Sequence, residues 1–137
     1  MVPLPSPERV RYAVSRADMA LDQLEKTVLW LDADPGSEER WGRLDATAKR
    51  FEIAFEYVWK ALKLAIDYSG DEVFGPRDAI NLAIIRVWIT SPDAWAAFLQ
   101  ARNAGVHDYF GMDPEEYATV ARDFLVDARV VLSRIPV

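Results

Sequence analysis

Apolar residues recur at alternating steps of four and three along two long segments of the chain. The first segment carries Val10, Val14, Ala17, Leu21, Leu24, Val28 and Leu31. The second carries Trp41, Leu44, Ala48, Phe51, Phe55, Val58, Leu62 and Ala65. Because residues three and four apart share one face of a helix, each segment predicts an amphipathic helix with one buried stripe. The common period of about 3.5 residues favours nearly parallel packing of the two helices in a bundle.

Capping and turn residues predict where these two helices begin and end. Ser6-Pro7-Glu8 combines an N-cap, a proline at the first helical position and an acid in the first turn. Asp34-Pro35-Gly36 ends the first helix, and Ser37-Glu38-Glu39 opens the second. Gly70 then ends the second helix, because glycine readily adopts the left-handed conformation that closes a helix.

Three shorter helices are predicted after the two long ones. The first starts at Pro76 and is expected to bury Ile80, Ala83, Ile84, Val87 and Trp88. The next opens at Thr90-Ser91-Pro92-Asp93, breaks near Gly111 and buries Trp95, Phe98 and Leu99. The last begins at Asp113-Pro114-Glu115-Glu116, where an acidic N-cap and a glutamate at the third helical position form the strongest cap signal of the chain. Its apolar positions are Tyr117, Val120, Phe124, Ala128, Val131 and Leu132.

These elements predict one all-α domain over residues 1–137. No segment alternates between apolar and polar residues as a half-buried strand does, and the connections are short. The predicted fold is an up-and-down helical bundle of about five helical segments. Four would form the main bundle, with the segments that begin at Pro76 and Pro92 sharing one side.

Composition narrows the chemistry. The 137 residues include no cysteine and one histidine, which excludes disulfides, thiolate zinc sites and a multi-histidine metal site within one chain. The net charge of −6 argues against a nucleic-acid-binding protein that relies on bulk electrostatics, so any nucleic-acid role would have to depend on a local site. No apolar run reaches the roughly 18 residues of a membrane span, and the N-terminus lacks the pattern of a signal peptide. We therefore expect a cytoplasmic protein with no cofactor, no metal, no membrane partner and no DNA partner.

Several catalytic signatures are missing or incomplete. The chain has no glycine-rich phosphate-binding motif, and Gly36-Ser37 followed by Asp45 lacks the second aspartate of a nucleotidyltransferase site. Glu52 and Glu56 stand one helical turn apart, as carboxylates of di-iron bundles do, but the matching Glu-x-x-His motif is absent. We interpret this pair as ordinary solvated or interface carboxylates.

One short segment combines residues that can carry out chemistry. Arg102, the single histidine His107 and Tyr109 form an Arg-x4-His-x-Tyr pattern. On a straight helix Arg102 and Tyr109 align to about 20°, whereas Arg102 and His107 lie about 140° apart. The arginine and the histidine therefore converge only if the arginine side chain wraps around the helix, if the helix loosens at Gly105, or if a second copy supplies one of them.

A longer pattern makes the chain similar to a known family. Residues 50–63 read Arg-Phe-Glu-Ile-Ala-Phe-Glu-Tyr-Val-Trp-Lys-Ala-Leu-Lys, and Pro76-Arg77 and a helix with Trp95 lead to Arg-Asn-x-x-x-His-x-Tyr at residues 102–109. In order and spacing this resembles the nucleotidyltransferase substrate-binding protein family over roughly residues 45–132. The resemblance does not cover the Pro-rich N-terminal extension.

The resemblance implies a fold, partners and two candidate functions. The family belongs to the HEPN superfamily of helical-bundle dimers and is encoded beside a minimal nucleotidyltransferase. Many members, HepT-type toxins among them, are metal-independent ribonucleases that use the arginine and histidine of the motif, here Arg102 and His107. In HepT-type members the partner adenylylates the motif tyrosine, here Tyr109. The implied function is a ribonuclease toxin subunit silenced in this way, and the alternative is a non-catalytic subunit that docks the nucleotidyltransferase.

Each site residue also has a structural interpretation. His107 is a candidate base for an RNA 2′-hydroxyl, and Arg102 a candidate phosphate ligand, but Arg102 could instead pair with Asp108 or with an acid of a partner chain. Asn103 is expected to orient His107 or to cap a carbonyl, and Tyr109 could simply pack in the bundle. We expect the tryptophans to lie in the core or a dimer interface, with base stacking as the alternative: Trp30, Trp41, Trp59, Trp88 and Trp95.

Overall fold

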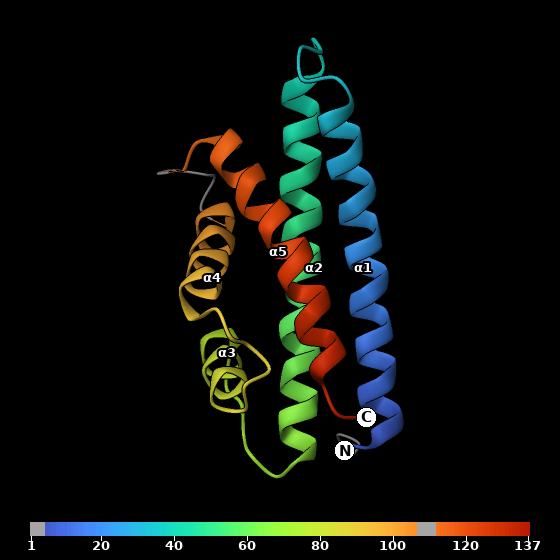
Figure 1. The fold of residues 1–137 in the computed structure, drawn as a ribbon, viewed down its shortest axis with the longest axis vertical. Helices are drawn as coiled ribbons and strands as arrows, with labels where there is room; N and C mark the ends of the chain where they lie inside the picture. The colour runs from blue at the N-terminus through green and yellow to red at the C-terminus, as the bar shows by residue number, and fades with distance from the viewer. Residues whose placement is uncertain (1–4, 107–111) are drawn as a thin grey trace.

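The computed structural model describes residues 5–106 and 112–137. Its elements are α1 (Pro7–Ala33), α2 (Arg40–Tyr68), α3 (Pro76–Ile85), α4 (Pro92–Val106) and α5 (Pro114–Arg134). Figure 1 shows α1 and α2 side by side along the long axis, with α5 packed across them and α3 and α4 stacked along one side. Within the described ranges there is no strand, so the predicted all-α bundle and the shared side of α3 and α4 are confirmed.

The first long helix forms as its caps and stripe predict. The Ser6 hydroxyl accepts a hydrogen bond from the Arg9 backbone N–H at 3.2 Å, which satisfies one of the free N–H groups at the helix start. All the predicted stripe residues of α1 are buried except Val14, which is partly buried against the core. Burial of the stripe, rather than helix propensity alone, therefore holds α1 in place.

The second long helix begins at Arg40, three residues after Ser37. Ser37 makes a turn instead of a cap, because its hydroxyl accepts from the Glu39 N–H at 3.0 Å and its carbonyl from the Arg40 N–H at 3.1 Å. The predicted end is confirmed, since α2 stops at Tyr68 and Gly70 follows with a left-handed φ of 104°.

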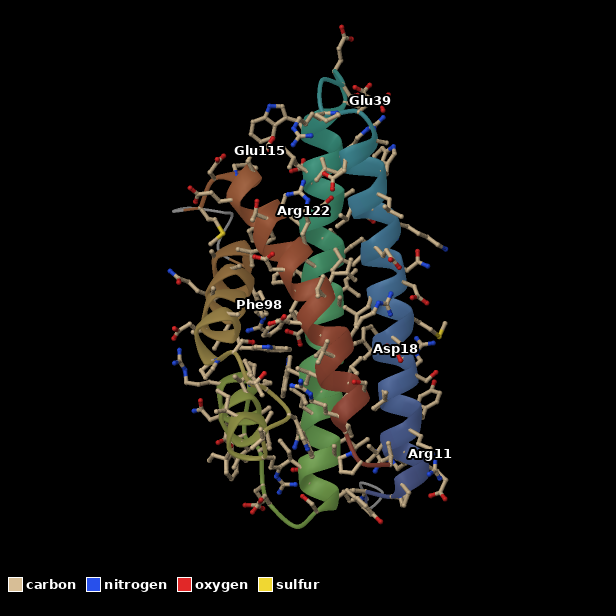
Figure 2. The ribbon with its side chains drawn as sticks, in the orientation of Figure 1. Arg11, Asp18, Glu39, Phe98, Glu115 and Arg122 are labelled. Carbon is tan, nitrogen blue, oxygen red and sulfur yellow. The ribbon has the colours of Figure 1, made fainter. Side chains whose placement is uncertain are left out.

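An aromatic cluster joins α2, α4 and α5 at the centre of the core. The ring of Phe124 lies 5.2 Å from Phe51, 5.6 Å from Trp95 and 5.3 Å from Phe98, measured between centroids, and each pair is edge to face. Figure 2 places Phe98 between α4 and α5. These contacts fix the position of α4, the helix that carries the candidate motif.

Two predicted core positions are wrong. Trp41 is 67% exposed, because it lies in the first turn of α2, where the described residues that share a cleft with it, among them Met112 and Pro114, cover it only in part. Val87 is 65% exposed, because α3 ends at Ile85 and Val87 adopts a left-handed φ of 61° that turns the chain away from the stripe. Among the tryptophans, Trp88 and Trp95 are buried as predicted, whereas Trp30, like Trp41, is exposed in this chain.

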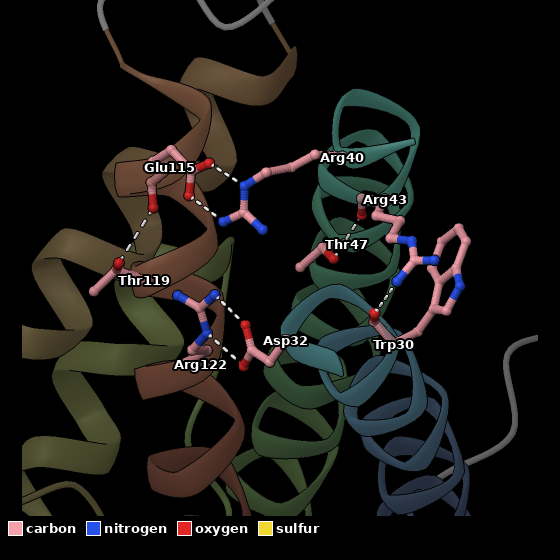
Figure 3. Close-up of polar contacts among 8 residues, drawn as sticks. All are labelled: Trp30, Asp32, Arg40, Arg43, Thr47, Glu115, Thr119 and Arg122. Carbon is pink, nitrogen blue, oxygen red and sulfur yellow. Dashed lines mark hydrogen bonds and ion pairs between the residues drawn. The ribbon is translucent and has the colours of Figure 1, made fainter. Parts of the chain in front are cut away.

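The last helix starts where its cap signal predicts but without the predicted capping bond. Asp113 occupies the N-cap position, yet its side chain makes no cap hydrogen bond. Glu115 instead forms a two-pronged pair with Arg40, with Nε and Nη2 both 2.6 Å from its carboxylate oxygens (Figure 3). A contact to another helix, rather than a local cap, therefore secures the start of α5.

Candidate functional site

The C-terminal part of α4 carries the described half of the candidate motif. Arg102 and Asn103 lie in this part of α4, which continues as a helix through Gly105 to Val106. The helix therefore shows no break at Gly105 as far as Val106. His107 and Tyr109 lie outside the described residues, so their roles stay predictions.

Arg102 reaches across to α2 and pairs with Glu56. Its Nη2 donates to Glu56 Oε1 at 2.5 Å, and its Nη1 donates to Asn103 Oδ1 at 3.1 Å. The side chains of Arg102 and Glu56 are 26% and 33% exposed, so the pair is partly shielded from water. Within the described residues, the acid that pairs with Arg102 is therefore Glu56, which lies two helices away in the same chain.

Glu56 gathers three donors around one carboxylate. Besides Arg102, the Trp59 indole Nε1 donates to Glu56 Oε2 at 3.1 Å, and Lys60 Nζ lies 3.8 Å from the same oxygen. Of the two expectations for Glu56, a solvated or an interface carboxylate, the structure thus shows a carboxylate at the interface between α2 and α4. Asn103 and Glu56 both accept hydrogen bonds from the Arg102 guanidinium, and together they fix its orientation. Among the described residues, the side chain that Asn103 orients is therefore Arg102.

Gly105 is where α4 comes closest to its neighbours. A β-carbon at this position would overlap Glu52 Oε1 of α2 and lie 2.7 Å from the Tyr117 hydroxyl of α5. Only a residue without a side chain fits between these two groups without a shift. The glycine therefore sets how closely the motif end of α4 approaches α2 and α5.

Two open clefts meet at Arg102. The larger, of about 470 Å³, lies between α3 and α4, with Arg77 and Asn81 on one wall and Arg102 and Asn103 on the other. The smaller, of about 200 Å³, lies between α2 and α4 and is lined by Lys49, Glu52, Ile53, Glu56 and Arg102. A ligand in either cleft can thus contact the guanidinium of Arg102.

Arginine–carboxylate pairs hold α5 against α1 and α2 around this site. The Arg40 guanidinium donates to Glu115 and holds the pKa of that carboxyl below its usual range. Arg122 forms a second two-pronged pair with Asp32 at 3.1 and 2.6 Å (Figure 3). These pairs orient α5, whose Tyr117 in turn contacts the α4 segment at Gly105.

Neither a metal-binding cluster nor a membrane-spanning helix is found among the described residues. Within residues 5–106 and 112–137, no group of three or more acidic, histidine or cysteine side chains is placed to hold a metal ion. None of the helices in the described ranges has the length and apolar character needed to cross a bilayer.

The fold and the arginine-centred site define a helical-bundle protein of the HEPN-like class. The chain matches the family described as "nucleotidyltransferase substrate binding protein like" over residues 12–135, and it belongs to that family. The family name links the chain to a nucleotidyltransferase. None of the curated proteins matches the sequence.

The sequence interpretation missed two features of the site. Glu56 belongs to the Arg-Phe-Glu-Ile-Ala-Phe-Glu pattern, but its partner Arg102 lies 46 residues further along the chain. The pair becomes visible only when α4 packs on α2. Arg77 belongs to the Pro76-Arg77 pair, but no sequence spacing predicts that it shares a cleft with Arg102. What the sequence does show is that Glu56 and Arg77 belong to the patterns that resemble the family.

Proposed function

We propose that the chain is the HEPN-type subunit of a toxin–antitoxin pair and acts as a metal-independent ribonuclease that its partner nucleotidyltransferase inhibits. One observation supports this best: the Arg102 guanidinium is oriented by Glu56 and Asn103 at the junction of two open clefts. An oriented arginine beside a cleft is suited to bind phosphate oxygens with two parallel hydrogen bonds. A purely structural arginine would need no access to ligand-sized space.

The proposed reaction is an internal transesterification of RNA. Neutral His107 accepts the proton of a ribose 2′-hydroxyl, and the 2′-oxygen forms a bond to the adjacent phosphorus. The bond from phosphorus to the 5′-oxygen breaks, and the proton passes to that oxygen. The products are a 2′,3′-cyclic phosphate and a free 5′-hydroxyl. Arg102 stabilises the negative charge that develops on the phosphate oxygens.

Tyr109 is proposed as the residue that the partner modifies. In this transfer the phenol oxygen bonds to the α-phosphorus of ATP, the bond from that phosphorus to the β-phosphate oxygen breaks, pyrophosphate leaves and the phenolic proton is released to solvent. The product would carry a phosphodiester with one negative charge seven residues from Arg102. That charge would compete with the RNA phosphate for Arg102 and repel it. Incubation with the partner, ATP and magnesium should increase the intact mass by AMP units, and Tyr109→Phe should abolish the increase. No increase with an active partner, or an increase unchanged by Tyr109→Phe, would contradict this role.

RNA cleavage tests the catalytic proposal directly. Wild-type protein should cleave RNA in the presence of EDTA, and both Arg102→Ala and His107→Ala should abolish cleavage. Arg122→Ala is the matched control, because Arg122, like Arg102, pairs with a carboxylate of another helix but lines neither cleft. Cleavage that EDTA abolishes, or that persists in both site variants, would overturn the proposal.

A homodimer is proposed as the functional state. Several large aromatic and apolar side chains remain exposed in the described part of one chain, among them Tyr12, Met19, Trp30, Trp41 and Tyr57. Exposed apolar surface of this kind is typical of an interaction face. Equilibrium ultracentrifugation should show a dimer at micromolar concentration, and a purely monomeric protein would contradict both the dimer and a site assembled from two chains.

A docking subunit without catalysis is the second candidate function. It is favoured by the ion pair between Arg102 and Glu56, which already occupies the guanidinium, and by the net charge of −6. This reading predicts a stable complex with the nucleotidyltransferase and no RNA cleavage. Co-purification of the two proteins together with the cleavage assay separates the two functions.

A further inference from the structure

The cleft between α3 and α4 contains an arginine, Arg77, for which the described residues provide no partner. Within the described part of the chain, the exposed Arg77 guanidinium makes no hydrogen bond or ion pair, whereas the Arg102 guanidinium on the opposite wall is paired. We propose that this cleft binds single-stranded RNA and that Arg77 holds a phosphate next to the one held by Arg102. This inference rests on the proposed ribonuclease function and extends its site to a second helix.

The charges in the cleft favour an anion. Arg77 and Arg102 face it from α3 and α4, and Asp78 is the single acid among its described lining residues. The Asp78 carboxylate accepts a hydrogen bond from the Phe74 backbone N–H at 3.1 Å, so it is held toward the loop before α3. Glu56 pairs with Arg102 from the neighbouring cleft, so within the described residues the guanidinium available to an anion here is that of Arg77.

The other lining groups suit a nucleotide. Asn81 and Asn103 contribute amide side chains, which both donate and accept hydrogen bonds and can read base edges, and Leu99 contributes an apolar surface. The cleft volume of about 470 Å³ falls within the range of about 300–1,000 Å³ that is usual for ligand sites. Two arginines on different helices can contact successive phosphates, which a mononucleotide monophosphate cannot offer.

The test measures binding apart from cleavage. A fluorescent single-stranded RNA with 2′-O-methyl groups lacks the attacking hydroxyl, so its anisotropy reports affinity for the full-length wild-type chain. Arg77→Ala should weaken binding about tenfold at low salt and reduce the slope of log affinity against log salt by about 0.7, the value for one lost phosphate contact. Arg77→Lys should recover most of the slope, and Asn81→Ala should leave the slope unchanged.

Arg11→Ala is the matched control. Arg11 is an exposed arginine on α1, on the far side of the bundle from α3 and α4 (Figure 2). Its removal changes the net charge equally and should change affinity by less than about twofold, with the slope unchanged. Equal affinity and slope for Arg77→Ala and Arg11→Ala would overturn the inference. Full displacement of the RNA by an equal phosphate concentration of AMP would also overturn it, because the cleft would then be a mononucleotide site.

Cleavage of unmodified RNA in parallel separates this inference from the proposed function. Cleavage by the wild type with no binding defect in Arg77→Ala would overturn the Arg77 site alone. A specific binding defect in Arg77→Ala without any cleavage by the wild type would support the cleft and overturn the ribonuclease. Wild-type protein that neither binds nor cleaves RNA would overturn both.

Discussion

Replacement of Gly105 by alanine tests the close approach of α4 to its neighbours. The new β-carbon would overlap Glu52 Oε1 and lie 2.7 Å from the Tyr117 hydroxyl. Glu52 is half-buried, and its carboxylate can rotate away at little cost. Tyr117 cannot move as easily, because it is 1% exposed and its ring packs edge to face on Phe51 at 5.4 Å. Tyr117 therefore decides whether Gly105→Ala stabilises or destabilises the fold.

Two opposing contributions set the change in the free energy of unfolding of Gly105→Ala. Alanine in place of glycine stabilises a helix by about 0.5–1 kcal/mol, and less near a helix end. Overpacking of a filled site costs about 1–3 kcal/mol. We expect a net loss of roughly 0.5–2 kcal/mol in the free energy of unfolding, or a fall of about 2–8 °C in Tm for a chain of this size.

Gly42→Ala is the matched control for the assay. Gly42 is also a helical glycine, but a β-carbon there would meet nothing within 4 Å, so this variant should gain stability. Thermal unfolding followed by circular dichroism compares the two variants. A double-mutant cycle with Tyr117→Phe should show coupling between positions 105 and 117. A rise in Tm for Gly105→Ala equal to that of Gly42→Ala would refute the close approach.

Three further predictions concern the other contacts of the fold and site. Arg40 lowers the pKa of Glu115, so this pair stabilises the fold fully above the ordinary glutamate pKa of about 4.3, and the stabilisation is lost as the pH falls through the lowered pKa of the folded state. Glu115→Gln should therefore lower Tm at pH 7 and lower it progressively less as the pH falls below about 4.3, and a pH-independent loss, or an equal pH dependence in the exposed control Glu38→Gln, would contradict this assignment. Phe124→Ala should cost about 3–5 kcal/mol in chemical denaturation, because it opens a cavity at the centre of the aromatic cluster, and a loss below about 1 kcal/mol would contradict that placement. Glu56→Gln should lower kcat of RNA cleavage more than Lys60→Ala does, because Glu56 contacts Arg102 directly and Lys60 contacts only Glu56, and equal effects would assign Glu56 a general electrostatic role.

Sequence reasoning predicted the helices, most of their boundaries and most of the core. These features follow from local rules, because a helix buries residues three and four positions apart and begins at recognisable caps. Its errors arose where a tertiary contact competed with a local signal. Trp41 continues the stripe of α2 but lies in the first turn of that helix, where it stays 67% exposed. Asp113 has a cap sequence but makes no capping bond, and Glu115, two residues later, pairs with Arg40.

The candidate site was likewise predictable from the sequence only in part. The motif around Arg102 could be found from residue identity and spacing, because these are properties of one short segment. The pairing of Arg102 with Glu56 and the cleft shared with Arg77 depend on how α4 is rotated and shifted relative to α2 and α3. That placement results from the packing of Trp95 and Phe98 on Phe124, and hydrophobic patterning specifies which face is buried but not which partner residue it meets.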